Sequence, residues 1–319
     1  MEDTLVPARI GLFYDRFTGI SRDILGDDLH LGYWPTPDAC GPQDTLQAAT
    51  RRMTSLAIGM LHPRRGQTVL DVGSGCGSPA ITLAKASGAN VRGITVSADQ
   101  VRIANAQATA SGMGEQVAFQ YGDASNPAFP SDTFHAAWAI ESLCHLSDRA
   151  QALAGIARVL RPGGRVLITD LVITGPVERG KRRHLADYAE RFKMAFPATP
   201  ETYREELAKA GFDIHAHQDL TRHVVNRSFN AITAHIRDRR EELEQTYDPD
   251  LIASFDLAQL ADLPELGYHA IVGQRRFRPH LRTCSSSEEA RDARCGVVRG
   301  VRTACIRGRH VPRTGCDPQ

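Results

Sequence analysis

The sequence carries no excess of charge of either sign and no long apolar run. Its 319 residues include 38 Lys and Arg against 37 Asp and Glu. A nucleic-acid or membrane-surface protein usually has a basic excess, so neither partner is expected. Every charge-free stretch is short and interrupted, which excludes a transmembrane helix. Residues 1–4 include two acids, and no basic segment precedes an apolar run there. We therefore expect no secretory leader and a cytoplasmic protein.

Cysteine is scarce over most of the chain. Cys40, Cys76 and Cys144 are the three in the first 278 residues, and four more lie in the last 41. A disulfide-stapled fold is typical of small secreted chains, which this is not expected to be. The spacing of the last four matches no zinc pattern, so we expect free thiols and no metal site. Residues 279–319 have eight Arg, no aromatic residue and no periodicity, which predicts a disordered tail.

Residues 66–172 alternate between short apolar runs and stretches with helical spacing. Five strands are predicted, at residues 67–72, 90–96, 117–121, 134–140 and 164–172. Three helices are predicted between them, at residues 78–86, 98–111 and 147–160. This alternation favours a parallel, doubly wound sheet with helices on both faces. Two further strands, predicted at 211–220 and 268–276 in a hairpin-like relation, extend it to seven mostly parallel strands.

The segments around this α/β region are predicted to be helical. Residues 1–65 form an N-terminal helical cap in this interpretation, and residues 66–278 form the α/β domain. Inside that domain, residues 175–198 and 222–262 interrupt the alternation and are interpreted as lid insertions. Residues 229–261 within the second insertion are predicted to be a long polar helical stretch that forms a lid or a side domain.

A glycine cluster follows the first predicted strand. Gly73, Gly75 and Gly77 lie between that strand and the next helix. Glycine lets the backbone approach a ligand where a Cβ atom would collide, and a helix N-terminus offers free N–H groups to a carboxylate or phosphate. The spacing is G-x-G-x-G, whereas dinucleotide-binding proteins carry G-x-G-x-x-G. The cluster therefore predicts a ligand site, although a plain chain reversal remains an alternative.

Residues 71–77 (DVGSGCG) resemble the first motif of class I S-adenosylmethionine (SAM)-dependent methyltransferases. Further segments agree with that family in order and spacing, at residues 93–100, 122–124, 139–145 and 159–165. The closest resemblance is to the antibiotic-tailoring branch typified by the rebeccamycin sugar O-methyltransferase. Residues 29–34 and 263–268 also resemble that branch, so the resemblance covers residues 8–278.

The resemblance implies SAM as cofactor and suggests which residues hold it. The glycine turn and the acid before it would hold the carboxylate end and the crowded ribose: Asp71, Gly73, Gly75 and Gly77. Thr95 and Gln100 would hold the ribose, Asp123 and Ala124 would meet the adenine, and Glu141 would touch cofactor or substrate. Tyr14 and His30 would belong to a cap over the methionine end. Plain structural roles remain open for Thr95, Gln100, Asp123, Tyr14, His30 and Glu141.

Two residues at the predicted carboxyl ends of neighbouring strands could carry the chemistry. A hydroxyl acceptor benefits from a general base, by about 10²–10⁴-fold. His145 follows the fourth strand and Asp170 ends the fifth, where doubly wound sheets bind ligands. We expect His145 to be the base and Asp170 the carboxylate that orients it. Relatives commonly carry two adjacent histidines here, whereas this chain has Cys144 before His145.

The function that this pattern implies is methyl transfer from SAM to a hydroxyl, or an amine, of a small secondary metabolite of glycosylated or polyketide type. One alternative is a cyclase of the spinosyn type, which keeps SAM but transfers no methyl group, and Cys144 points mildly that way. Another alternative is a SAM-binding protein without catalysis. The expected partner is a small-molecule substrate, and a homodimer is compatible with the sequence.

Overall fold

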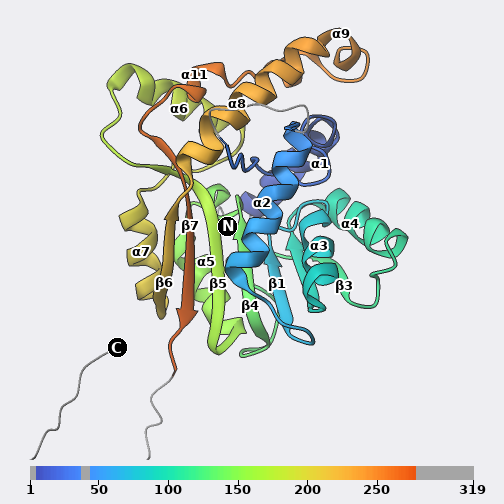
Figure 1. Cartoon of the computed structure of the whole chain (residues 1–319), viewed down its shortest axis with the longest axis vertical. Coiled ribbons are helices and arrows are strands. Elements are labelled where there is room, and N and C mark those ends of the chain that lie inside the picture. Colours follow the sequence, from blue (N-terminus) through green and yellow to red (C-terminus); the bar gives the residue numbers. More distant parts are fainter. Residues whose placement is uncertain (1–4, 37–43, 278–319) are drawn as a thin grey trace, which may run out of the picture. The chain divides into compact units, whose positions relative to one another are not determined.

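A seven-stranded sheet forms the centre of the computed structural model, which describes residues 5–36 and 44–277 (Figure 1). The strand order is β3-β2-β1-β4-β5-β7-β6. The strands are β1 (Thr68–Val72), β2 (Asn90–Thr95), β3 (Val117–Tyr121), β4 (Phe134–Ile140), β5 (Leu160–Ile173), β6 (Phe212–Asp219) and β7 (Leu266–Arg275). β1 to β5 pair in parallel, and β7 runs antiparallel to both β5 and β6. The predicted doubly wound, mostly parallel sheet is confirmed.

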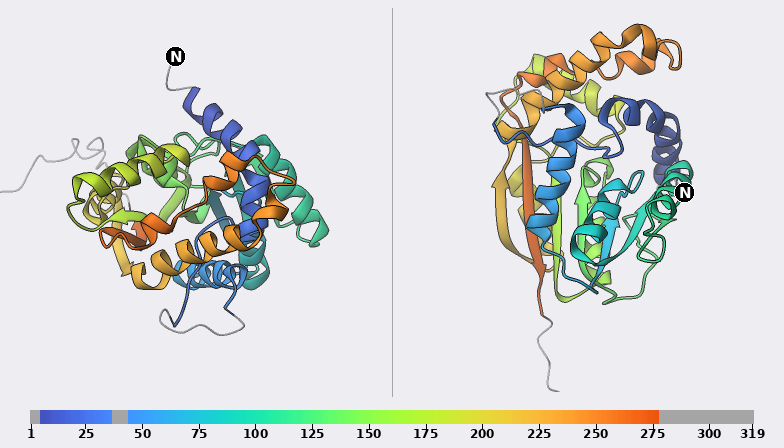
Figure 2. Two further views of the ribbon diagram at one scale, coloured as in Figure 1. Left: turned by 90° about the horizontal axis from the view of Figure 1, so that it is seen from above. Right: turned by 45° about the vertical axis from the view of Figure 1, so that its right-hand side comes forward.

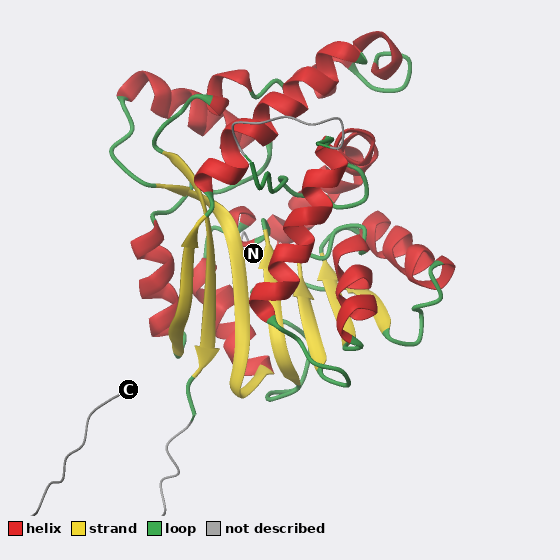
Figure 3. Ribbon diagram, viewed as in Figure 1, coloured by secondary structure: helices red, strands yellow, loops and turns green. Residues whose placement is uncertain are grey.

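Helices cover both faces of the sheet (Figures 1 and 3). One face is covered by α2 (Leu46–Leu61), α3 (Ser78–Ser87) and α4 (Ala98–Ala110), and the other by α5 (Arg149–Val159) and α7 (Pro200–Lys209). Successive strand residues point to opposite faces, so Val69 joins the apolar core under α2–α4 while Leu70 joins the core under α5 and α7. These two cores fix the carboxyl ends of the parallel strands.

The remaining helices gather beyond those carboxyl ends (Figure 2). They are α1 (Leu5–Leu25), the short 3₁₀ helix η1 (Leu143–His145), α6 (Arg179–Arg191), α8 (Thr221–Asp238), α9 (Arg240–Leu243), α10 (Pro249–Ala253) and α11 (Ala258–Ala261). We call α6 and α8–α11 the lid. None of the helices within residues 5–36 and 44–277 is both long and apolar enough to cross a bilayer.

The predicted helical stretch over residues 229–261 is helical but interrupted. The helix starts earlier, at Thr221, and three short helices follow it. Proline disfavours helical backbone at the residue before it, and Asp248, which precedes Pro249, is extended and caps α10 by accepting from the Asp250 N–H. The predicted tail at 279–319 and Cys40 lie outside the described residues.

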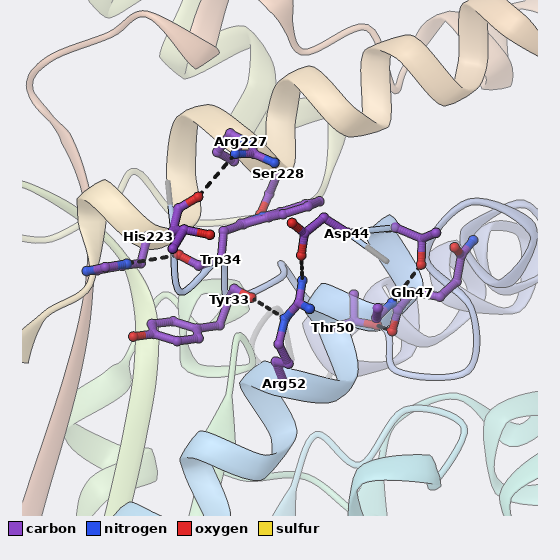
Figure 4. A network of polar contacts seen from close by, with 12 residues as sticks. Tyr33, Trp34, Asp44, Gln47, Thr50, Arg52, His223, Arg227 and Ser228 are labelled. Carbon is purple, nitrogen blue, oxygen red and sulfur yellow. Dashed lines mark hydrogen bonds and ion pairs between the residues drawn. The ribbon is translucent and has the colours of Figure 1, made fainter. Parts of the chain in front are cut away.

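Residues 29–36 form a strap between α2 and the lid helix α8 (Figure 4). The Ser228 hydroxyl accepts from the Gly32 N–H at 3.1 Å and from the Trp34 indole N–H at 3.2 Å. The Trp34 backbone N–H donates to the His223 carbonyl oxygen. The Arg52 guanidinium donates to the Tyr33 carbonyl oxygen at 3.2 Å. These bonds hold the strap from both sides, so its inner end, at Leu29–Leu31, is fixed against the strand ends.

Candidate active site

The turn after β1 depends on glycine. Gly73 has φ +76° and Gly77 has φ +87°, a region that side chains rarely adopt. A Cβ on Gly73 would lie 2.3 Å from the Ser142 Cβ, and one on Gly77 would lie 2.5 Å from the Phe119 ring. The Gly73 and Ser74 N–H groups both donate to the Ile94 carbonyl at 2.9 Å, which ties the turn to β2. The turn is therefore held close to β2 and to the segment after β4.

A cavity of about 500 Å³ runs from this turn along the carboxyl ends of β2, β3 and β4. Its lining combines backbone of the glycine turn with polar side chains from these strand ends and a few apolar ones. The lining residues are Ile10, Tyr14, Leu29, Val72, Gly73, Gly75, Ile94, Thr95, Val96, Gln100, Tyr121, Gly122, Asp123, Ala124, Ser125, Asn126, Ile140, Glu141, Ser142, His145, Leu146, Ser147, Asp148 and Gln151. Its volume is typical of sites for cofactors and small molecules.

A second, smaller cavity of about 100 Å³ lies between α1 and the lid. Apolar and aromatic side chains make most of its wall, with a few polar groups among them. The lining residues are Phe13, Tyr14, Phe17, Ser21, Leu25, Leu29, His30, Leu31, Glu141, Cys144, His145, Asp170, Leu171, Tyr188, Phe192, Met194, Ile232, Phe255 and Leu257. Four residues line both cavities, namely Tyr14, Leu29, Glu141 and His145. These four therefore mark the boundary between the two cavities.

His145 is held at this boundary by hydrogen bonds to both ring nitrogens. Its Nδ1 lies 3.1 Å from the Lys193 carbonyl oxygen, and its Nε2 lies 2.6 Å from the Tyr14 hydroxyl. A carbonyl oxygen only accepts, so Nδ1 carries the proton and the Nε2 lone pair accepts from Tyr14. Burial lowers the pKa of His145 to about 4. The imidazole is therefore neutral at physiological pH, with its basic nitrogen turned toward Tyr14.

Two carboxyl groups face the smaller cavity. The Glu141 Oε1 accepts from the Leu31 N–H and from the Tyr268 hydroxyl, each at 2.8 Å, and Glu141 has a left-handed backbone with φ +46°. The Asp170 Oδ2 accepts from the Tyr203 hydroxyl at 2.8 Å. Burial raises the pKa of both carboxyl groups to about 7. The two acids thus sit in an environment that disfavours their charged forms.

The helix α1 closes one side of the larger cavity. The Thr95 hydroxyl donates to the Gln100 Oε1 at 2.7 Å, and the Gln100 Nε2 donates to the Thr18 hydroxyl at 3.2 Å. The Asp15 carboxylate accepts from the Ser97 hydroxyl at the start of α4. A Cβ on Gly11 would lie 2.0 Å from the Val96 carbonyl oxygen, so α1 packs there with no room for a side chain.

Comparisons with known proteins agree with this geometry. A model of the methyltransferase domain matches residues 69–164. The chain is 33% identical over 274 residues to the O-methyltransferase resE of Aspergillus sclerotiorum, which covers 85% of this chain and 99% of that protein. It is 32% identical over 275 residues to the 27-O-demethylrifamycin SV methyltransferase of Amycolatopsis mediterranei, covering 84% of this chain and 97% of that protein. The chain belongs to the class I SAM-dependent methyltransferases.

A solved structure is similar over nearly the same span. The cyclase SpnF superposes with a TM-score of 0.73 at 27% identity, covering 85% of this chain and 97% of that one. The predicted methyltransferase fold is therefore present in this chain, and the family shows that its cofactor is SAM.

The described residues fit this cofactor. Among them, the Ser142 hydroxyl lines the larger cavity and its oxygen is buried without a hydrogen-bond partner. The larger cavity adds hydroxyl, amide and carboxyl groups at the strand ends. The amino-acid end and the ribose of SAM carry donors and acceptors that can form hydrogen bonds with these polar groups of the cavity. Within the same residues, no three His, Cys, Asp or Glu side chains are placed to hold a metal ion.

Most of the predicted cofactor residues line the larger cavity. They are Tyr14, Gly73, Gly75, Thr95, Gln100, Asp123, Ala124 and Glu141. Asp71 and Gly77 line neither cavity: Asp71 lies within β1, and Gly77 is the N-cap of α3. His30 lines only the smaller cavity, and its ring nitrogens are bonded to the Leu31 carbonyl and the Thr54 hydroxyl, each at 3.0 Å. The structure therefore gives His30 a place in the strap rather than beside the larger cavity.

The predicted hydrogen bond between Asp170 and His145 is not formed. His145 uses both ring nitrogens for Tyr14 and Lys193, and Asp170 bonds to Tyr203 instead. Sequence reasoning missed these partners for physical reasons. Lys193 contributes only its backbone carbonyl, so its side chain carries no signal. Tyr203 lies on α7, 33 residues beyond Asp170, and no local pattern connects the two.

Proposed function

We propose that this methyltransferase transfers the methyl group of SAM to a hydroxyl of a small, largely apolar secondary metabolite, with His145 as general base. One observation carries the proposal: a neutral imidazole, held through Nδ1, presents Nε2 where the two cavities meet. In this assignment the larger cavity holds the cofactor and the smaller one holds the reacting end of the acceptor. Both substrates then meet beside His145.

The chain's own groups would act as follows. SAM supplies an activated methyl group, so alignment of the acceptor oxygen provides most of the rate. The acceptor hydroxyl replaces the Tyr14 hydroxyl at His145 Nε2, which accepts its proton as the oxygen is methylated. The Nδ1–H keeps its hydrogen bond to the Lys193 carbonyl oxygen, and this bond stabilises the imidazolium that forms. Thr95, Gln100, Asp123 and the backbone of the glycine turn would hold the nucleoside and the amino-acid end.

The class of acceptor is inferred from the cavity wall and the relatives. Aromatic and aliphatic side chains of α1 and the lid form most of the smaller cavity, which suits an apolar scaffold. By their printed names, one relative is an O-methyltransferase and another acts on 27-O-demethylrifamycin SV. We infer a glycosylated or polyketide-type acceptor and place the enzyme in the antibiotic-tailoring branch, near the rebeccamycin-type sugar O-methyltransferases.

The segments 175–198 and 222–262 act as the lid in this proposal, since they carry α6 and α8–α11. Residues 1–65 act as the cap, and residues 66–278 as the SAM-binding domain. We also infer a cytoplasmic enzyme, and a homodimer remains compatible with the proposal.

The product mass tests the reaction class. Purified enzyme is incubated with SAM and a panel of hydroxylated macrolactones and sugar-bearing polyketides, and products are analysed by mass spectrometry. We expect one acceptor to gain a single methyl group with an equal amount of S-adenosylhomocysteine (SAH) formed. A panel without any methylated product, from enzyme shown to bind SAM, would contradict the proposal.

A cyclase activity is the second candidate, favoured by the similarity to SpnF. A ring closure needs a shaped apolar cavity and no proton acceptor, and the smaller cavity has such a wall. The same assay separates the two, because a cyclase gives a product of unchanged formula without consuming SAM. A purely SAM-binding protein is favoured less, since it would be expected to have a filled space beside His145.

A further inference from the structure

Asp170 has one carboxylate oxygen with a partner and one without. The Tyr203 hydroxyl donates to Oδ2 at 2.8 Å, whereas Oδ1 is buried with no hydrogen-bond partner among the described residues. The whole side chain is 2% exposed, so water does not replace the missing partner freely. Leaving such a group unpaired is unfavourable, and more so when the group is charged. An oxygen of this kind indicates that a ligand supplies the donor.

The neighbouring side chains fix the position of the Asp170 carboxylate but leave Oδ1 without a hydrogen-bond partner. Tyr203 is itself packed under the Arg149 guanidinium, 5.2 Å from its ring centre, and Arg149 pairs with Glu206 at 3.2 Å. This chain of contacts between α5 and α7 keeps Oδ2 on Tyr203. The Cys144 thiol and the Cys144 backbone N–H also lie near the carboxyl group and lower its pKa, but neither forms a hydrogen bond with Oδ1. Oδ1 is therefore the oxygen left for a ligand in the smaller cavity, which Asp170 lines.

The charges of the other residues that line the smaller cavity limit which ligands can bind there. Two carboxyl groups line it, and no Lys or Arg of the described chain does. A carboxylate or phosphate on the acceptor would be repelled there and would lose its hydration without compensation. A neutral group that donates a hydrogen bond fits both the aromatic wall and the free oxygen.

We propose that Asp170 is a specificity residue: its Oδ1 accepts a hydrogen bond from a second hydroxyl of the acceptor, next to the hydroxyl that is methylated. The acceptor is then a neutral molecule with two neighbouring hydroxyls, one directed to His145 and the other to Asp170. This rests on the proposed O-methyl transfer and replaces the expected role of Asp170 in orienting His145. Tyr203 is the positioning residue for the carboxylate.

The test uses binding, so that it does not depend on turnover. The full-length enzyme is loaded with SAH, and the dissociation constants of catechol and of 2-methoxyphenol are measured by calorimetry at pH 8. At that pH the Asp170 carboxyl, whose pKa is raised to about 7, is ionised. Catechol offers a second hydroxyl donor, whereas the methoxy group can only accept. We expect catechol to bind about tenfold more tightly, as for a hydrogen bond to a charged group.

The Asp170→Asn variant keeps the shape of the side chain and one accepting oxygen, which pairs with the Tyr203 hydroxyl, so that an NH2 donor takes the place of Oδ1. We expect the ratio of the two constants to fall to about one in this variant, while SAH affinity stays unchanged. Asp213→Asn, an exposed position on β6, is the matched control and should keep the ratio. A merely structural role of Asp170 would weaken both probes equally and leave the ratio intact.

Several outcomes would overturn the proposal. A ratio near one in the wild type refutes it, as does a tenfold preference that survives in Asp170→Asn. Benzoate binding as tightly as catechol refutes the exclusion of anions. If Asp170→Asn fails to fold, Tyr203→Phe decides, because it frees the carboxylate to turn and should lower the ratio a few-fold. Loss of methyl transfer with the binding ratio intact would instead contradict only the proposed function.

Discussion

Replacing Gly73 with alanine should separate the conformational demand of the glycine turn from its role in holding the cofactor. Left-handed backbone costs an alanine about 1–2 kcal/mol relative to glycine. At Gly73, with φ +76°, the new Cβ would also lie 2.3 Å from the Ser142 Cβ. Such overpacking adds about 1–3 kcal/mol. The total loss in the free energy of unfolding should therefore be about 2–5 kcal/mol.

Gly66 provides a matched control, since it has the same φ of +76° and no atom within 4 Å of the Cβ position. Gly66→Ala should cost only the conformational part, about 1–2 kcal/mol. The double variant Gly73→Ala/Ser142→Gly removes the colliding Cβ and should recover the overpacking part. Urea unfolding measures the stabilities, and calorimetry measures SAH affinity.

We expect SAH binding to weaken at least tenfold in Gly73→Ala and to be unchanged in Gly66→Ala. If the two variants lost the same stability, and both bound SAH as the wild type does, the reasoning about the turn would be refuted.

Three further predictions concern the surroundings of the site. Because burial raises the pKa of Glu141 from 4.5 to about 7, ionising it opposes folding as pH rises; Glu141→Gln should gain stability over the wild type between pH 5 and pH 8, by up to about 3 kcal/mol in urea unfolding. A gap that shrinks with pH would contradict this. Gly11→Ala should raise the Kd for SAM several-fold, because the new Cβ would push α1 away from the Val96 carbonyl oxygen. Gly19→Ala on the same helix is the control and should leave the Kd unchanged, since the nearest atom to its Cβ lies at 3.4 Å. Equal effects of the two variants would argue against α1 closing the cavity. Ser228→Ala should lower the free energy of unfolding by about 1–3 kcal/mol, since it leaves the strap's buried N–H groups unpaired; an unchanged unfolding midpoint would show that the strap is not held this way.

The sheet could be predicted from the sequence because its signals are local. Apolar runs such as 67–72 alternate with helical periodicity, and the glycines of the turn sit between a strand and a helix. These features depend on backbone geometry and on the two faces of each strand. The cofactor residues at the strand ends were implied by the resemblance to the methyltransferase family, and Thr95 and Gln100 do line the larger cavity.

The side-chain partners could not be predicted in the same way. Asp170 lies on β5 and His145 follows the neighbouring strand β4, but they do not bond to each other. Asp170 accepts from Tyr203 of α7, and His145 bonds to the backbone carbonyl of Lys193, which follows α6. His30 satisfies both ring nitrogens locally, which removes it from the larger cavity. The partner of each buried polar group depends on which helices, distant in the sequence, pack beside it. It also depends on which of their groups can replace the hydrogen bonds that the buried group loses with water.

The central claim is that His145 Nε2 accepts the proton of the acceptor hydroxyl. Single-turnover methyl transfer by His145→Ala, with enzyme saturated with SAM, tests this most directly. Loss of a general base should slow the transfer about 10²–10⁴-fold while the SAM dissociation constant stays within about twofold of the wild type. Transfer to the hydroxyl at the wild-type rate would contradict the account.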